Sequence, residues 1–291
     1  MIKKKYVKKA LIGKGGFGEI FKVLDNETNK FYALKYIAMN KDDIKKIEKE
    51  ITVMKNIEND YIIKLKEFFY DEDAFGYCIV MELCDGNLRD ILNKYKPEGL
   101  PLNIIKKIFL QLNEALKTMI KKGFIHRDLK PENILIKYTD SNKTNFNIKL
   151  TDFGLSTDEV TSSIKPHSNA GDKIYKAPEV DNFKYNKKCD LWSLGIILYE
   201  LYTNKYIFDS NKPEETQNNR YKGKIVKETD NEMINKLIRK LIQVDIDKRI
   251  TWEEYFKDDF FQIEEENKKD KNELTDINSN NNNNINRIRQ K

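Results

Sequence analysis

The sequence predicts an α+β protein with two lobes, in which a small β-rich lobe precedes a larger, mainly helical one. Residues 6–82 form short strand-like runs around one helical stretch, whereas helical spacing dominates after about residue 83. With 291 residues, the chain can bury a sizeable core without disulfides or metals. A cleft between two such lobes is a usual place for a ligand.

The small lobe contains several short runs of β-branched and aromatic residues, which are typical of strands. We expect strands over residues 6–11, 20–24, 31–37, 61–70 and 77–81. Between Ile44 and Met54 the apolar residues step by three and four, which predicts one face of a helix. This lobe is therefore expected to be a sheet with one helix.

The larger lobe is dominated by apolar residues at helical spacing. Amphipathic stripes run over residues 104–119 and 234–241. Residues 190–201 are apolar nearly all round, which predicts a helix buried inside the lobe. The polar stretch 138–147 interrupts the pattern and is expected to be the tip of a hairpin.

Charge and composition narrow the class of partner. The chain carries 53 basic and 47 acidic residues, which gives a net charge of +6. Only seven of the basic residues are arginines, whereas proteins that read nucleic acids rely on the planar arginine fork. Scattered lysines are typical of solvated faces, so we expect no nucleic-acid partner.

Other features indicate an intracellular protein. The three cysteines and two histidines form no disulfide or zinc pattern, and free thiols fit a reducing compartment. The N-terminus lacks the pattern of a signal peptide, and no apolar run approaches the ~18 residues that span a bilayer. We expect no membrane attachment, with the cytoplasm favoured over the nucleus. Residues 262–291, which include an Asn-rich run, are expected to be a disordered tail.

A glycine cluster lies between the first two expected strands. Its sequence, Gly13-Lys14-Gly15-Gly16-Phe17-Gly18, has the form G-x-G-x-x-G. Such glycines let the backbone approach phosphate oxygens and offer N–H groups to them. The residues after Gly18 alternate like a strand, whereas a dinucleotide site needs a helix there. The pattern therefore favours a glycine-rich flap.

One lysine and one glutamate are expected to form an ion pair. Lys35 lies in the third expected strand, and a lone lysine on a strand is usually exposed to solvent. Glu50, however, shares a helix face with the apolar Ile47 and Met54, and a carboxylate facing inward needs a cationic partner. We expect Lys35 to be that partner, so that its ammonium is held ready for phosphate groups.

Four motifs follow one another in a specific order. They are His126-Arg127-Asp128-Leu129-Lys130-Pro131-Glu132-Asn133, Asp152-Phe153-Gly154, Ala177-Pro178-Glu179 and Asp190-x-Trp192-Ser193-x-Gly195, followed by Arg249. With them, the chain resembles eukaryotic serine/threonine protein kinases from about residue 6 to 261. The resemblance implies the two-lobed protein kinase fold, with a small antiparallel sheet plus one helix over residues 6–82 and a mainly helical lobe over residues 83–261.

The resemblance implies a reaction and its cofactors, ATP and Mg²⁺. Asp128 would be the catalytic base that orients a Ser or Thr hydroxyl of a protein substrate. Lys130 would neutralise charge on the transferred phosphoryl group. Asn133 and Asp152 would hold Mg²⁺, which prefers oxygen ligands.

The same resemblance implies a nucleotide site between the lobes. Met81 would lie at the back of the adenine pocket, and the backbone of the next three residues would form the hinge that binds adenine. The residues implied in ATP binding are Ile12, Gly13, Lys14, Gly15, Gly16, Phe17, Gly18, Glu19, Ile20, Lys35, Glu50, Glu82 and Cys84. The Cys84 side chain itself is expected to be a small buried filler.

Other motif residues are expected to be structural. In the family that this chain resembles, His126 is packed rather than catalytic. Asp190 is expected to anchor the catalytic loop. Glu179 and Arg249 are expected to form a buried salt bridge within the helical lobe.

Control is expected to lie in the activation loop, residues 152–179. Arg127 matches family members that are switched on by phosphorylation of this loop. Ser168 lies four residues before Asp172, which is the spacing of a primary phosphosite. Phospho-Ser168, made by an upstream activating kinase, would pair with Arg127 and order the loop. The alternative is that the Ser and Thr hydroxyls of this segment have no regulatory role, because hydroxyls are common in exposed loops.

One residue departs from the family pattern. Related kinases usually carry Gly-Thr before Ala-Pro-Glu, whereas this chain has Gly171-Asp172. A carboxylate there could pair with Lys130 but would crowd the charge of Asp128. The alternative function is therefore a pseudokinase-like scaffold that binds ATP with weak or no catalysis. A third hypothesis is a small-molecule kinase on a related fold.

Overall fold

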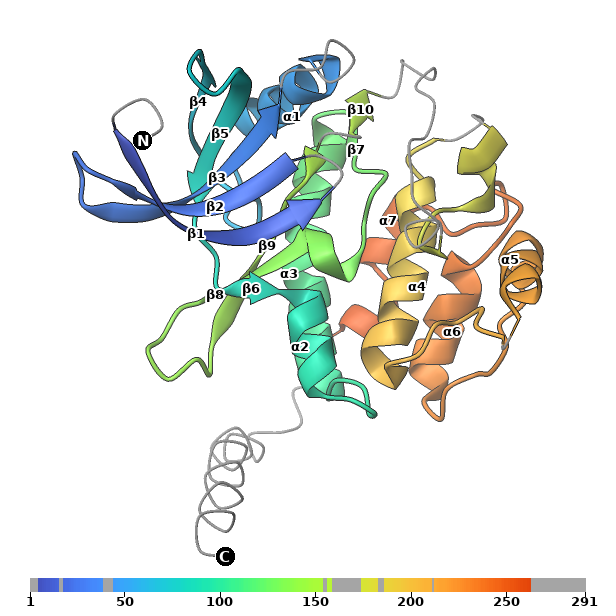
Figure 1. The fold of residues 1–291 in the computed structure, drawn as a ribbon. Coiled ribbons are helices and arrows are strands. Elements are labelled where there is room, and N and C mark those ends of the chain that lie inside the picture. The colour runs from blue at the N-terminus through green and yellow to red at the C-terminus, as the bar shows by residue number, and fades with distance from the viewer. Residues whose placement is uncertain are drawn as a thin grey trace, which may run out of the picture.

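The computed structural model describes residues 5–15, 18–38, 44–153, 156–158, 174–182, 186–210 and 212–262. The chain forms a small lobe built around a sheet and a larger lobe built from helices (Figure 1). The two-lobed protein kinase fold expected from the sequence is confirmed. Residues 263–291 and the expectation of a disordered tail lie outside the described residues.

The small lobe is a five-stranded antiparallel sheet in the order β1-β2-β3-β5-β4. Its strands are β1 (Tyr6–Gly15), β2 (Gly18–Asp25), β3 (Lys30–Ala38), β4 (Leu65–Asp71) and β5 (Gly76–Glu82). Helix α1 (Ile44–Asn56) follows β3. It buries Ile47, Ile51 and Met54, the apolar positions that predicted one helix face.

The expectation of a strand over residues 61–70 is wrong for its first four residues, because β4 begins at Leu65. Instead, the Ile63 N–H donates to the Leu150 carbonyl at 3.0 Å, and the Leu150 N–H donates to the Tyr61 carbonyl at 2.8 Å. Ile62 and Ile63 are both buried. These apolar, β-branched residues therefore form a bridge to Leu150 and do not belong to the sheet of the small lobe.

The larger lobe contains the remaining helices. These are α2 (Leu88–Lys94), α3 (Leu102–Lys121), α4 (Cys189–Thr203), α5 (Pro213–Lys222), α6 (Glu232–Leu241) and α7 (Trp252–Phe256). Helix α4 is buried along most of its length, as its apolar sequence predicted. A Cβ atom on Gly195 would lie 2.9 Å from Leu241 Cβ, so glycine lets α4 and α6 approach closely, side by side in Figure 1. None of the helices within the described ranges is long and apolar enough to cross a bilayer.

A hairpin of β8 (Ile134–Tyr138) and β9 (Phe146–Leu150) lies between the motif that contains Asp128 and the motif that begins at Asp152. The polar stretch 138–147 forms its tip, as predicted. Strand β6 (Gly86–Asn87) joins its edge, and β7 (Phe124–Ile125) pairs with β10 (Thr157–Asp158). Because η1 (Pro131–Asn133), a 3-10 turn, leads into β8 and Asp152 follows β9, the hairpin sets the spacing between the Asp128 and Asp152 motifs.

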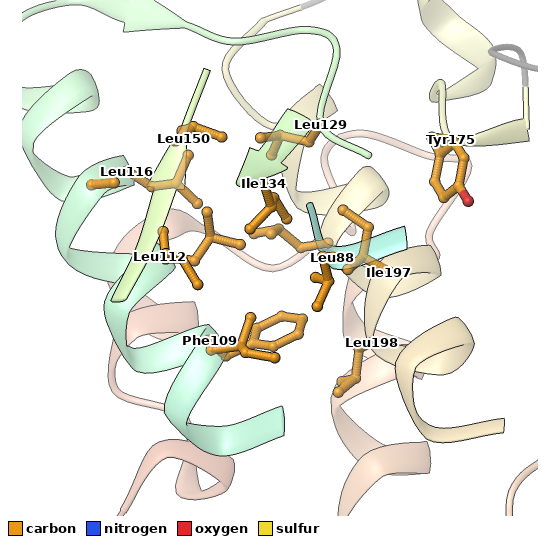
Figure 2. Packing of buried hydrophobic residues seen from close by; sticks show 14 of the residues in the cluster. Leu88, Phe109, Leu112, Leu116, Leu129, Ile134, Leu150, Tyr175, Ile197 and Leu198 are labelled. Carbon is orange, nitrogen blue, oxygen red and sulfur yellow. The ribbon is translucent and has the colours of Figure 1, made fainter. Parts of the chain in front are cut away.

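One apolar core runs through both lobes. Buried residues of α1 and β3 belong to the same cluster as those of α3, α4 and α6. Figure 2 shows Leu112 and Leu116 of α3 close to Leu150 of β9, and Ile197 of α4 close to Leu88 of α2. A second, small cluster covers the outer face of the sheet, and its members are Tyr6, Val23, Leu34, Phe69, Cys78 and Val80.

Candidate active site

The glycine cluster forms a hairpin between β1 and β2. Gly13 pairs with Ile20, Lys14 with Glu19, and Gly15 with Gly18. At Gly18 the angle φ is +121°, and a Cβ atom would lie 2.1 Å from the Tyr36 carbonyl oxygen, so this position requires glycine. The prediction that a strand rather than a helix follows Gly18 is confirmed. Gly16 and Phe17, two of the implied ATP-binding residues, lie outside the described part of the chain.

Lys35 joins the two lobes electrostatically. Its ammonium lies 2.9 Å and 2.8 Å from the two carboxylate oxygens of Glu50 in α1, so the predicted ion pair is present. The same ammonium lies 3.3 Å from Oδ1 of Asp152, beyond the end of β9. One buried cation therefore connects β3, α1 and the segment that begins Asp152-Phe153.

The pKa values of this cluster follow from burial and charge. Burial lowers the pKa of Lys35, but the carboxylates of Asp152 and Glu50 outweigh it and raise the pKa above its usual value. Burial favours a higher pKa at Asp152, yet the Lys35 ammonium holds it below the ordinary range. At Glu50 burial wins over the attraction of Lys35, so the pKa is raised. At neutral pH, Lys35 and Asp152 are both charged.

The second half of the site is the loop around Asp128. Oδ2 of Asp128 accepts a hydrogen bond from Asn133 Nδ2 at 2.9 Å and lies 3.1 Å from the Lys130 ammonium. Asn133 Nδ2 also donates to the Asp128 backbone carbonyl at 2.8 Å. The Asn133 carbonyl in turn accepts from the Thr151 N–H at 3.0 Å. This chain of contacts fixes the Asp128 carboxylate relative to the residue before Asp152.

Backbone strain and a buried carboxylate shape this loop. Arg127 and Asp152 adopt φ of +65° and +66°, a region that costs a non-glycine residue roughly 1–3 kcal/mol. Asp190 of α4 accepts from the backbone N–H groups of His126 and Arg127, both at 2.8 Å. His126 packs edge-on against Phe153, with ring centroids 5.4 Å apart. The predictions of an Asp190 anchor and a packed His126 are confirmed.

The hinge contains an ion pair that sequence reasoning missed. The Glu82 carboxylate, at the end of β5, lies 2.9 Å from the Lys149 ammonium and also binds Lys137. Burial favours a higher pKa at Glu82, but these two lysines hold it below the usual range. The Glu82 N–H donates to the Lys64 carbonyl at 3.0 Å, which ties the end of β5 to the residue before β4. Burial raises the pKa of the Cys84 thiol to about 12, which fits a packing role.

Charged residues of the larger lobe form two further networks. Glu179 and Arg249 make the predicted buried salt bridge, with contacts of 2.6 Å and 3.1 Å. Arg89 of α2 binds Glu132 at 2.8 Å and Glu200 at 2.6 Å. Nothing in the local sequence signals the Arg89 network, because its members come from three separate segments. Gly154, Ser168, Gly171 and Asp172 lie outside the described residues.

Comparisons with known proteins agree with this arrangement. The family described as "Protein kinase domain" matches residues 6–261. Serine/threonine-protein kinase 33 of Mus musculus is 33% identical over 259 residues, which is 84% of this chain and 52% of that protein. Probable serine/threonine-protein kinase nek1 of Dictyostelium discoideum is 30% identical, covering 90% of this chain and 59% of that protein.

A third relative is Calcium-dependent protein kinase 6 of Plasmodium berghei, which is 37% identical over 72% of this chain and 14% of that protein. The chain spans about half the length of the first curated relatives it matches. The family match covers the glycine hairpin, the Asp128 loop and the Glu179–Arg249 pair alike. The chain therefore belongs to the protein kinase family.

Proposed function

We propose that the chain transfers the γ-phosphoryl group of ATP to Ser or Thr hydroxyls of protein substrates. The observation that carries this proposal is the Lys35 ammonium shared by Glu50 and Asp152, since it pairs a phosphate-binding cation with a carboxylate suited to metal. The relatives named as serine/threonine kinases support the acceptor class.

Asp128 is the proposed catalytic base. Its carboxylate is held by Asn133 and Lys130, so it is oriented before a substrate hydroxyl arrives and can accept the hydrogen bond of that hydroxyl. The Lys130 ammonium is close enough to Asp128 to stabilise negative charge developing between the hydroxyl and the phosphoryl group. Phosphoryl transfer depends mainly on such positioning and charge.

Asn133 and Asp152 are the proposed magnesium ligands, and the donor set fits. Asn133 uses its Nδ2 to bind Asp128, which leaves its amide oxygen for a cation. The Asp152 side chain is 21% exposed and is charged at neutral pH. Mg²⁺ commonly takes only one or two protein ligands and completes its shell with phosphates and water. When bound, it supplies positive charge against the phosphate oxygens.

The test is transfer from labelled ATP, with Mg²⁺, to a degenerate peptide library carrying Ser, Thr or Tyr acceptors. We expect label on Ser and Thr peptides, loss of transfer in Asp128→Asn, and unchanged transfer in Asp209→Asn, an exposed carboxylate that serves as the control. A wild type that binds ATP yet labels no peptide after Ser168 phosphorylation has been verified would favour the scaffold function instead. Label confined to a metabolite would favour a small-molecule kinase.

Phosphorylation of Ser168 is the proposed switch. Ser168 belongs to the segment that precedes Ala177-Pro178-Glu179, and Arg127 is the proposed partner of its phosphate. We expect intact-mass spectrometry to find one phosphate that Ser168→Ala removes, together with a loss of activity. Ser162→Ala is the matched control in the same loop. Undiminished activity of Ser168→Ala would overturn the switch without touching the proposed reaction.

A further inference from the structure

Helix α5 docks without an apolar face. Its sequence is Pro-Glu-Glu-Thr-Gln-Asn-Asn-Arg-Tyr-Lys, and its buried residues are Asn219 and Arg220. A surface helix normally packs through an apolar stripe, and a helix that is polar all round lacks that source of stability. The position of α5 against the lobe therefore depends on polar contacts.

Arg220 makes the most demanding of these contacts. Its side chain is 4% exposed, and a buried guanidinium is costly unless its donors are satisfied. Nε donates to the Lys176 carbonyl at 2.7 Å, and Nη2 donates to the Ala177 carbonyl at 3.2 Å. Nη1 donates to Asp181 Oδ2 at 2.9 Å. Arginine suits this place because its planar fork can reach three separate acceptors.

These acceptors all lie in one short segment, residues 174–182, which contains Ala177-Pro178-Glu179 and the 3-10 turn η4 (Pro178–Asn182). Other elements hold the same segment. The Ser193 hydroxyl of α4 donates to the Tyr175 carbonyl at 2.8 Å, and Arg249 binds Glu179. Arg220 is the contribution of α5, and it holds Lys176 and Ala177, two of the three residues that lie between those fixed points.

We propose that Arg220 is a positioning residue for the protein substrate, acting through the backbone of Lys176 and Ala177. This inference rests on the proposed function and extends it: a protein substrate that reaches Asp128 would lie against residues 174–177, since Arg89 contacts both Glu132, which follows Asp128, and the Tyr175 hydroxyl. A peptide bound there needs a fixed backbone to lie against, and small displacements of a binding surface cost large factors in rate. Nucleotide binding depends on other elements, so Arg220 acts on the peptide and not on ATP.

The test compares Arg220→Met and Arg220→Lys with wild type in steady-state kinetics, using the best peptide from the library. We expect Arg220→Met to raise KM for the peptide by about tenfold while KM for ATP stays within about twofold. Arg220→Lys keeps the charge but not the fork, so its KM for the peptide should be intermediate. The control is Arg239→Met, because Arg239 is exposed and pairs with Glu228 and Glu232 on the surface. An unchanged KM for the peptide, or an equal rise in both KM values, overturns the proposal.

Hydrogen exchange distinguishes a failure of this proposal from a failure of the proposed function. If the wild type transfers no phosphate, the reaction is wrong, but amides of residues 174–182 should still exchange faster in Arg220→Met than in wild type. Unchanged exchange there overturns the positioning role whatever the kinetics. Should Arg220→Met fail to fold, Asp181→Asn removes the ion pair and keeps the side-chain shape, and the same two outcomes apply to it.

Discussion

Two buried ion pairs, one in each lobe, are completed in different ways. The Arg249 guanidinium uses all five of its N–H donors, two on Glu179 and three on the carbonyls of Gln243 and Lys188. The Lys35 ammonium is instead divided between Glu50 and Asp152. Asp152 keeps 21% of its side chain exposed, whereas Glu179 keeps 9% and Arg249 none. We call Arg249–Glu179 the closed pair, because the protein itself uses all of the guanidinium donors, and we expect this pair to stabilise the fold. We call Lys35 with Glu50 and Asp152 the open pair, because Asp152 is partly exposed and can take a ligand.

Breaking the closed pair should give the largest effect, and the effect should be on stability. Arg249→Met leaves the Glu179 carboxylate buried without its partner, which typically costs ~3–5 kcal/mol of unfolding free energy. Urea denaturation followed by circular dichroism measures this loss. Transfer per folded molecule at saturating ATP and peptide should change much less. A midpoint equal to that of wild type would contradict the structural reading of this pair.

Breaking the open pair should affect the reaction more than the fold. Lys35→Met removes the cation that would meet phosphate oxygens, and loss of one such contact typically lowers the rate by roughly 10²–10³-fold. Stability should fall less than in Arg249→Met, because burial raises the pKa of Glu50 and so makes it easier for this carboxyl to take up a proton once the cation is gone. The same urea assay beside the kinase assay checks both parts. A stability loss as large as that of Arg249→Met would erase the distinction between the two pairs.

Removing the carboxylate of Glu82, which binds Lys137 and Lys149, should have an intermediate effect on stability, and that effect should depend on pH. Because the folded pKa of Glu82 is below its unfolded value of 4.5, its ion pair stabilises the protein above about pH 4.5. That contribution is lost as the pH falls through the folded pKa. Glu82→Gln should therefore be less stable than wild type by ~1–2 kcal/mol at pH 7 and equally stable once wild-type Glu82 is protonated. A pH-independent difference would point to packing rather than charge.

The smallest effect is expected at Asp172, which adds one more carboxylate to the sequence of the activation loop. Removing that charge with Asp172→Thr should leave the transfer rate unchanged or raise it, since the carboxylate would crowd Asp128. Parallel assays on Ser and Thr peptides measure the rate and the acceptor preference together. A collapse of activity would show that Asp172 has an adapted role of its own.

The elements that the sequence predicted best are those with a strong local signal. Residues 44–54, 104–119 and 234–241 carry apolar periods, residues 190–201 are apolar nearly all round, and the structure contains a helix at each place. The Lys35–Glu50 pair followed from one inward-facing carboxylate. The order of the strands and the Lys35–Asp152 contact depend on how distant segments pair, and local periodicity does not encode that pairing.

What the sequence analysis missed has physical causes. Helix α5 lacks any apolar period, although Pro213 at its start and Gly223 just past its end bracket it. Helix α7 was signalled only by the capping box of Thr251 and Glu254. The contacts of Arg220 could not be foreseen, because two of its three acceptors are backbone carbonyls, which any sequence supplies.

The apolar core that continues from α1 and β3 into α3 and α4 determines how the protein responds to heat. Two lobes that share one core cannot lose their packing independently, so a calorimeter should record a single transition for the domain. A nucleotide analogue that binds between them would then raise that one transition temperature by mass action, and the whole domain would gain thermal resistance from a ligand that touches only its middle.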